Sequence, residues 1–302
     1  MWLLDGALQF QPYMYEKGSK GFFGPLSQNT MGRPNFITDA IRTLVATGVA
    51  HQVLFNVTIG LVQLAIGACL LYGRTTRIAL AASAIWAAGV WVGGEALGQM
   101  IFPQASMLTG APGAALVYLV VSLVLWPVRD GEAPGEAGEA GEAGEAGEAG
   151  EAGLLGAAGA RAAWAVIWCG SALLELESGN FAPRGVSAQL AYSARGEPGA
   201  VAWIDKTSAH LAAGHGTIIA FSMLLVELFA GWGIVRAPTR RAALATGIAA
   251  SLVYWVVGQN FGLMLTGQAT DPNLGPVMIL FALCLWPRTR RAGAAEAVPG
   301  QG

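Results

Sequence analysis

Long apolar runs dominate the pattern of the chain. Stretches near 20 residues recur, and about 20 apolar residues are enough for a helix to cross a hydrocarbon core of roughly 30 Å. A soluble domain could not enclose so many apolar helices. We therefore predict an all-α, polytopic membrane protein with about eight transmembrane helices, the first one truncated. The expected spans are 1–12, 50–72, 78–101, 108–127, 162–178, 211–235, 242–265 and 274–286.

The pattern of apolar and polar positions occurs twice along the chain. Positions 164 residues apart match without gaps from 34 to 100, with 17 identities in 67 positions, among them His51 with His215 and Trp91 with Trp255. Small length differences extend the match, pairing Trp2 with Trp168 and Leu125–Pro127 with Leu285–Pro287. Four spans per half bring both halves into the membrane from the same side, so we predict two parallel four-helix repeats.

The repeats define the expected domain boundaries. A tract of Gly, Glu and Ala separates the halves, and it is too poor in apolar residues to pack into a core. We expect a first membrane repeat over 1–128, a flexible cytoplasmic linker over 129–160, a second repeat over 161–288, and a disordered cytoplasmic tail over 289–302.

Composition and charge support a membrane location. The chain is 54% hydrophobic and 12% charged, and its net charge of −2 depends on the acidic tract. Arginines gather in the short loops, beside the linker and in the tail, which places these segments and both termini in the cytoplasm. The abundance of Ala, Gly and Arg is typical of a GC-rich bacterium. We therefore expect a multi-pass protein of the bacterial cytoplasmic membrane, in contact with the lipid bilayer.

The outer loops contain a second pattern. Apolar and polar positions mix after Pro34 and after Pro198, and proline suits the first turn of a helix. One interpretation is an amphipathic helix on the membrane surface or over the bundle. An ordinary re-entry loop explains the pattern equally well.

Ionisable side chains within the spans are the candidate functional residues, because each one is costly in lipid unless it is paired or hydrated. His51 and His215 occupy matched positions and could pass protons or polarise a ligand carbonyl; interfacial histidines at helix ends are the alternative. Glu95 is matched by Gln259, and the exchange is reversed where Gln63 meets Glu227. Either the duplicated site has become asymmetric, or two structural hydrogen bonds have drifted.

Two further carboxylates belong to this set. Asp5 lies in the truncated first span, and Glu175 lies near the outer end of the fifth span, where it could also mark the water boundary. Asp271 follows in a turn-rich outer loop, where it could cap the last helix or line an entrance.

Glycines flank the Glu95 and Gln259 positions. Small residues four apart allow helices to approach closely. We therefore assign a helix-packing role to Gly94, Gly98, Gly258 and Gly262.

Several kinds of chemistry have no signature here. Cys69, Cys169 and Cys284 form no CxxC pair, and the three histidines have no carboxylate or cysteine at ligand spacing, so we expect no metal site. Phosphate loops, nucleophile elbows and nucleic-acid modules are also missing, so nucleic acid is not an expected partner.

The second and third spans of each half resemble the DoxX-like family of four-helix membrane proteins. The resemblance rests on Val226-Glu227-Leu228 and on the turn formed by Gly73, Thr76 and Arg77, whose second copy keeps Thr239 and Arg241 but lacks the glycine. It covers about 60 residues per half. It implies a four-helix bundle used as a membrane subunit near redox chemistry, with a quinone as ligand and another membrane or redox protein as partner. Only Glu227 carries over, as a family-typical position without an assigned role.

Three functions stay open. The first is a redox-associated, quinone-linked membrane subunit. The second is a proton-coupled small-molecule transporter, with Glu95, Glu227 and the two histidines as the relay. The third is a non-catalytic scaffold for other membrane proteins. Whether the chain is an enzyme does not follow from the sequence.

Overall fold

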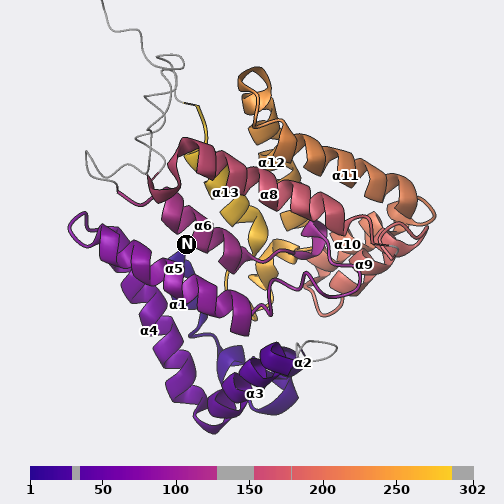
Figure 1. Cartoon of the computed structure of the whole chain (residues 1–302). Coiled ribbons are helices and arrows are strands. Elements are labelled where there is room, and N and C mark those ends of the chain that lie inside the picture. The colour runs from indigo at the N-terminus through magenta and orange to yellow at the C-terminus, as the bar shows by residue number, and fades with distance from the viewer. Residues whose placement is uncertain (29–34, 128–152, 178, 288–302) are drawn as a thin grey trace, which may run out of the picture.

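The computed structural model describes the chain except residues 29–34, 128–152, 178 and 288–302 (Figure 1). Within the described part every regular element is a helix. The α-helices are α1 (Trp2–Leu8), α2 (Phe23–Gln28), α3 (Asn35–Ala50), α4 (Gln52–Leu70), α5 (Thr76–Gly93), α6 (Ala114–Val124), α8 (Gly156–Leu174), α9 (Gly185–Ser193), α10 (Gly199–Ala212), α11 (Gly216–Trp232), α12 (Ala237–Val256) and α13 (Leu274–Cys284). Short 3-10 turns include η3 (Met107–Thr109), η4 (Gly153–Leu155) and η5 (Asn260–Leu263).

Three helices are long and apolar enough to cross a membrane: α4, α5 and the continuous helix formed by η4 and α8. A fourth span exists if α10 and α11 count as one, although their axes are bent by 107°. The eight expected spans are therefore not established. The expected helices at 108–127 and 274–286 shorten to 11 residues each, about 17 Å, which is too short for a bilayer core.

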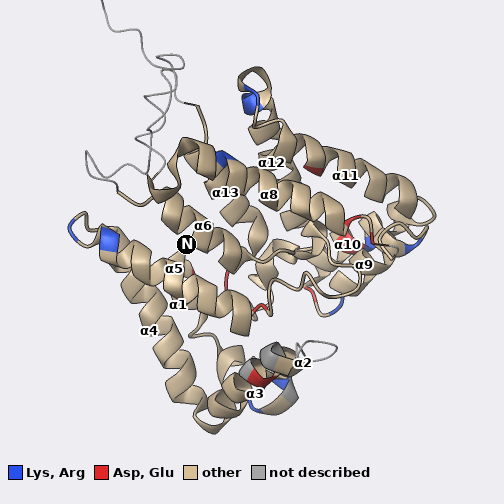
Figure 2. Ribbon diagram, in the orientation of Figure 1, with Lys and Arg blue, Asp and Glu red and all other residues tan. Residues whose placement is uncertain are grey.

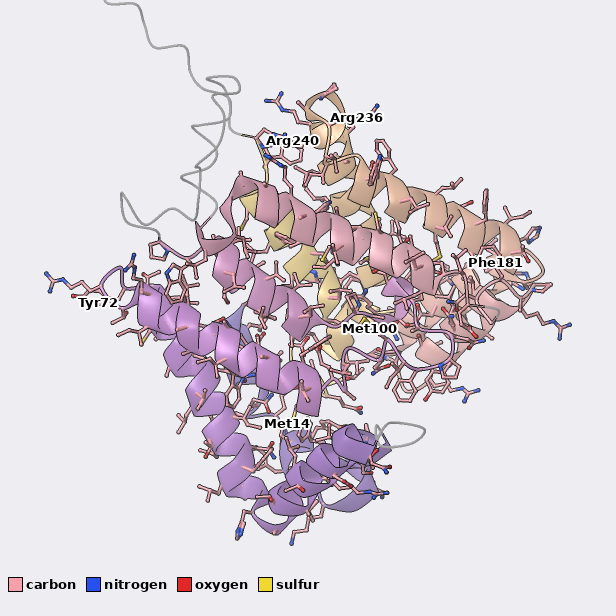
Figure 3. All side chains as sticks on the ribbon, viewed as in Figure 1. Met14, Tyr72, Met100, Phe181, Arg236 and Arg240 are labelled. Atoms are coloured by element: carbon pink, nitrogen blue, oxygen red, sulfur yellow. The ribbon has the colours of Figure 1, made fainter. Side chains whose placement is uncertain are left out.

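The outward faces of these helices are apolar. Val53 on α4 is 64% exposed, Ile85 on α5 is 75% exposed and Val166 on α8 is 70% exposed. Charged side chains are sparse along the long helices and more frequent at their ends, as at the turns near Tyr72 and Arg236 (Figures 2 and 3). Such surfaces suit lipid contact.

Two tight helix pairs organise the molecule: α1 packs against α4, and α8 packs against α11. A glycine allows each close approach. A Cβ atom on Gly67 would lie 2.8 Å from the Leu3 side chain, and one on Gly231 would lie 2.6 Å from the Cys169 sulfur. The remaining helices pair as α5 with α6 and α12 with α13, and α6 contacts α13.

The short basic turns after α4 and α11 contain the same kind of hydrogen bond. The Thr75 hydroxyl donates a hydrogen bond of 2.7 Å to the carbonyl of Cys69, and the Thr239 hydroxyl donates one of 2.6 Å to the carbonyl of Gly233. These bonds satisfy carbonyls that the helix ends leave unpaired.

The third span of each half ends earlier than expected. Helix α5 stops at Gly93 and α12 stops at Val256, so the spans predicted over 78–101 and 242–265 lose their last eight or nine residues. Each helix is followed by a left-handed turn in which residues 96–99 and 260–263 all have positive φ. The chain folds back there to meet the loop before the next helix.

The four glycines expected to pack helices together lie in or just before these turns. Gly94, Gly98, Gly258 and Gly262 all follow the helices instead of lying within them. A Cβ atom on Gly98 would lie 1.6 Å from the Pro112 carbonyl oxygen, so only glycine fits. A Cβ atom on Gly262 would likewise lie 2.5 Å from the Pro272 carbonyl carbon.

The segments that follow Pro34 and Pro198 are helical. Helices α3 and α10 begin directly after Pro34 and Pro198, so the amphipathic-helix interpretation describes them better than an ordinary loop. Helices α2 and α9 were not predicted.

The linker boundary also moves. Helix α8 begins at Gly156, inside the expected linker 129–160, whereas residues 129–152 and the tail 289–302 lie outside the described part of the chain.

Candidate functional site

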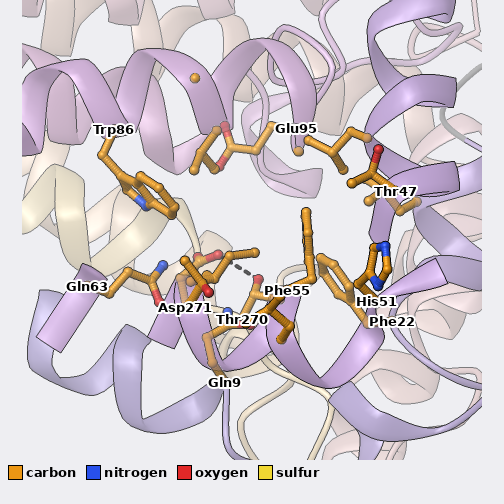
Figure 4. A pocket seen from close by; sticks show the side chains of 18 of the residues that line it. Gln9, Phe22, Thr47, His51, Phe55, Gln63, Trp86, Glu95, Thr270 and Asp271 are labelled. Carbon is orange, nitrogen blue, oxygen red and sulfur yellow. Dashed lines mark hydrogen bonds between the residues drawn. The ribbon is translucent and has the colours of Figure 1, made fainter. Parts of the chain in front are cut away.

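A cavity of about 640 Å³ opens in the first half of the chain (Figure 4). Its walls come from helices α2 to α5, and the second half contributes Thr270 and Asp271 from the loop before α13. Most of its lining is apolar, for example Phe22 and Phe55.

Four polar atoms at this cavity have no hydrogen-bond partner among the described residues. They are buried side-chain atoms of residues that line the wall: Gln9 Oε1, Gln63 Oε1, Trp86 Nε1 and Glu95 Oε2. Buried polar groups are nearly always paired, so four unpaired ones in residues around one cavity indicate a place for a ligand or water.

Glu95 and Gln259 hold equivalent positions but differ in how fully they are bonded. The Oε1 atom of each accepts a hydrogen bond of 3.0 Å from a backbone N–H at the start of the next helix, from Ala115 for Glu95 and from Gly275 for Gln259. Gln259 also donates from Nε2 to the Met107 carbonyl at 2.8 Å. The amide is therefore satisfied at both ends, whereas one oxygen of the carboxyl, Oε2, has no partner in the described structure.

Asp271 supplies a second carboxyl to the cavity wall. Its Oδ2 accepts a hydrogen bond of 2.8 Å from the Thr270 hydroxyl, and its Oδ1 accepts one of 2.7 Å from the Asn273 N–H. The Asn273 side chain then caps α13 by accepting from the Leu274 N–H. The loop thus both caps the helix and lines the cavity.

Burial makes both carboxyls weaker acids. Loss of water around Glu95, which lies beyond the end of α5, raises its pKa, and the nearby charge of Asp271 raises it further. Burial likewise raises the pKa of Asp271, although hydrogen bonds from Thr270 and Asn273 act against this shift.

The two histidines do not share a site. His51 lines the cavity and is exposed. His215 lies between α10 and α11, where its Nδ1 is 3.1 Å from the Ala213 carbonyl. The matched pair is therefore split between a cavity wall and a bend.

The exchanged pair Gln63 and Glu227 is split too. Gln63 lines the cavity, whereas Glu227 is fully buried on α11, near Glu175 and Tyr254. Glu175 is also buried and accepts a short hydrogen bond from the Ser106 hydroxyl. It does not mark a water boundary.

Asp5 is buried in the middle of the first half. It is 1% exposed, and its Oδ2 accepts a hydrogen bond of 2.7 Å from the Tyr118 hydroxyl on α6. Oδ1 has no partner in the described structure.

The cavity thus unites His51, Gln63 and Glu95 from the predicted set and leaves His215, Gln259, Glu227 and Glu175 elsewhere. Sequence reasoning missed Trp86, because an indole N–H gives no signal that it lacks a partner. In the described part of the chain no three His, Cys, Asp or Glu side chains group to hold a metal ion.

The mouth of the cavity meets the lipid-compatible surface. Leu54 on α4 is 67% exposed and Ile85 on α5 is 75% exposed, and both residues line the cavity. Exposed apolar residues of two helices that can cross a membrane therefore form part of the cavity wall.

No protein-family model, curated protein or solved structure matches the chain.

Proposed function

We propose that this chain is an integral membrane protein that binds a lipid-soluble ligand of the quinone class as a redox-associated membrane subunit. The observation that carries the proposal is the apolar cavity of about 640 Å³, which opens between α4 and α5 and is lined by unpartnered polar atoms. Ligand cavities typically measure about 300–1,000 Å³ and combine apolar walls with a few polar groups.

The position of the mouth favours a ligand that arrives from the lipid. Exposed Leu54 and Ile85 frame it with apolar side chains. A lipophilic ring with an isoprenoid tail could enter sideways and leave its tail in the bilayer. A water-soluble substrate would have to cross an apolar rim.

The polar atoms fit the two ends of such a ring. The Trp86 N–H can donate to a quinone carbonyl, and the free oxygens of Gln63 and Glu95 can accept from quinol hydroxyls. When bound, a quinone supplies two-electron chemistry coupled to proton uptake. Glu95 and Asp271 are the carboxyls placed to hold or release those protons.

The membrane arrangement belongs to the same proposal. Two parallel four-helix units, with both termini in the cytoplasm of a bacterial cell, would place the turns at Arg77 and Arg241 inside. The equivalent bonds of Glu95 and Gln259, and the two left-handed turns, support this duplication. The partial DoxX-like resemblance points in the same direction, and a redox partner would supply or accept the electrons.

Cavity blocking tests the function. Gly89 on α5 lines the cavity, and a Cβ atom there would meet nothing within 4 Å, so Gly89→Trp can fill the space without a backbone clash. We expect the purified full chain to bind ubiquinone-1 or menadione, measured by quenching of tryptophan fluorescence or by calorimetry. Gly89→Trp should lower the affinity at least about tenfold, a loss of about 1.4 kcal/mol.

Gly170→Trp on α8 is the matched control, because that glycine is also free of neighbours within 4 Å and lies outside the cavity. It should bind as the parent protein does. Equal affinities for the parent and Gly89→Trp, or no binding by the parent, would contradict the proposal.

A further inference from the structure

Two cavities approach the centre of the first half from opposite ends. The cavity of about 640 Å³, called the ligand cavity from here on, lies at the end of the bundle that contains Glu95 and Asp271. A polar chamber of about 180 Å³ adjoins it. A separate cavity of about 410 Å³ lies at the end of the basic turn, where it is lined by Leu71, Thr76 and Leu125.

The polar chamber differs in character from its neighbour. The two left-handed turns contribute Gly98 and Gly262, and Glu95, Thr270 and Asp271 line both the chamber and the ligand cavity. These shared residues form the boundary through which water in the chamber could reach the ligand cavity.

One hydrogen-bonded pair lies between the two ends. Asp5 on α1 and Tyr118 on α6 are both buried, and Tyr118 also lines the cavity at the basic end. On the other side Gln9, which follows Asp5 by one helical turn at the end of α1, lines the ligand cavity together with Asp271. The Oδ1 atom of Asp5 has no hydrogen-bond partner in the described chain.

Hydroxyl groups continue the polar line toward the basic end. Ser83 and Ser122 line that cavity, and their oxygens are 2.7 Å apart. The Trp2 N–H donates to the Ser83 oxygen at 2.8 Å, and the Ser122 hydroxyl donates to the Tyr118 carbonyl at 2.8 Å. Water in the cavity would therefore find hydroxyls beside Tyr118.

The second half lacks this pair. The match of Trp2 with Trp168 sets Ser171 opposite Asp5, and the match of Leu125 with Leu285 sets Met278 opposite Tyr118. Ser171 donates to the Ile167 carbonyl within its own helix, and methionine carries no transferable proton.

We propose that Asp5 and Tyr118 form a proton-transfer route that joins the cavity at the basic end to the chamber at Glu95 and Asp271. With the Asp5 proton on Oδ1, a water at the basic end gives a proton to the Tyr118 oxygen. Tyr118 passes its hydroxyl proton to Oδ2 of Asp5, and Asp5 releases the Oδ1 proton to water beside Asp271. One proton enters, one leaves, and only O–H bonds change.

The surroundings of Asp5 define what else could influence this transfer. The titratable groups that act on it are Tyr118 from α6, Asp271 from the loop before α13, and the amino group of Met1. The route does not depend on ligand binding, so it can be tested without any quinone.

The test measures proton flux in phosphatidylcholine liposomes that contain the purified full chain. A potassium gradient with valinomycin drives protons, and a trapped pH-sensitive dye reports them. We expect flux above that of protein-free liposomes, and its loss to that level in Asp5→Asn and in Tyr118→Phe.

Ser171→Ala is the matched control at the corresponding place in the second half, and it should keep the parental flux. Tyr118→Phe keeps the ring that packs on Trp2 at 4.5 Å, so it decides the test if Asp5→Asn does not fold, as judged by gel filtration. Parental flux in a folded Asp5→Asn or Tyr118→Phe variant, or no flux by the parent, would overturn the route. Neither outcome would affect the proposal that the cavity binds a quinone, which is tested by ligand binding.

Discussion

At the scale of single residues, the contrast between Glu95 and Gln259 explains why one position carries an acid and its counterpart an amide. Both accept the same backbone hydrogen bond, but only Gln259 also donates to a carbonyl, that of Met107, which accepts a second bond from the Gly110 N–H. An ionised carboxylate cannot donate there. The second carboxyl oxygen of Glu95, Oε2, has no hydrogen-bond partner in the described structure.

This contrast predicts unequal costs for the two exchanges. At a pH at which the introduced carboxyl is ionised, Gln259→Glu should destabilise the folded protein by about 1–3 kcal/mol, because a buried carboxylate would face the Met107 carbonyl with no proton to donate. Glu95→Gln should be nearly neutral, because the amide oxygen still accepts from Ala115. Thermal unfolding in detergent micelles measures both. Equal destabilisation by the two variants would contradict the assignment.

The raised pKa of Glu95 predicts how stability changes with pH. The folded protein holds a proton that the unfolded chain releases more easily. The resulting stabilisation is complete below the ordinary carboxyl pKa and is lost as pH rises through the raised pKa.

The check compares unfolding temperatures of the parent and Glu95→Gln across that pH range. The parent should lose more stability than the variant as pH rises. Asp271 titrates in both proteins, so the difference between them reports Glu95 together with its coupling to Asp271. A variant that follows the parent at every pH would argue against a buried, protonated Glu95.

At the scale of elements, α5 and α12 are each followed by a left-handed turn, and the turn after α5 lies beside Glu95 at the end of the large cavity. Each turn brings the chain back against the loop before the next helix, where the Trp91 indole donates to the Pro112 carbonyl at 2.9 Å and Trp255 to Pro272 at 2.8 Å. Without the turns, Glu95 would continue along the α5 helix.

Alanine at Gly98 tests this element. Its φ of +61° is strained for any residue with a Cβ, and the Pro112 carbonyl occupies the space. We expect Gly98→Ala to lower the free energy of unfolding by at least about 1–2 kcal/mol, the cost of a left-handed conformation alone.

Gly170→Ala on α8 is the control, since its Cβ would meet nothing within 4 Å. It should raise stability by about 0.5–1 kcal/mol, because alanine suits a helix better than glycine. A neutral Gly98→Ala would show that the turn is not needed.

At the scale of the whole molecule, most hydrogen bonds between the two halves of the described chain go to one segment, residues 104–107, and Gln11 adds one to the Ala269 carbonyl. The Gln104 N–H donates to Glu177, the Ala105 and Met107 carbonyls accept from Asn180 and Gln259, and Ser106 donates to Glu175. This seam, together with the packing of α6 on α13, connects the halves independently of the Gly-Glu-Ala tract.

The seam predicts that the halves stay together after the tract is cut. A protease site inserted near residue 142 allows cleavage of the folded, full-length protein. Both fragments should then elute as one species in mild detergent. Glu175→Ala, which leaves the Ser106 hydroxyl without its acceptor, should weaken this association. Fragments that separate immediately after cleavage of the parent would contradict the seam.

The sequence by itself determined the helical class, the presence of helices apolar enough to cross a membrane and the pairs of matched positions, because these depend on local composition and on spacing along the chain. Its predicted boundaries at 101 and 265 were wrong, since hydropathy does not register a left-handed turn. Tertiary structure alone decided which matched residues face a cavity. Gln63 and Glu95 face one, and Glu227 and Gln259 do not, because Asp271 and the Met107 carbonyl arrive from distant parts of the chain.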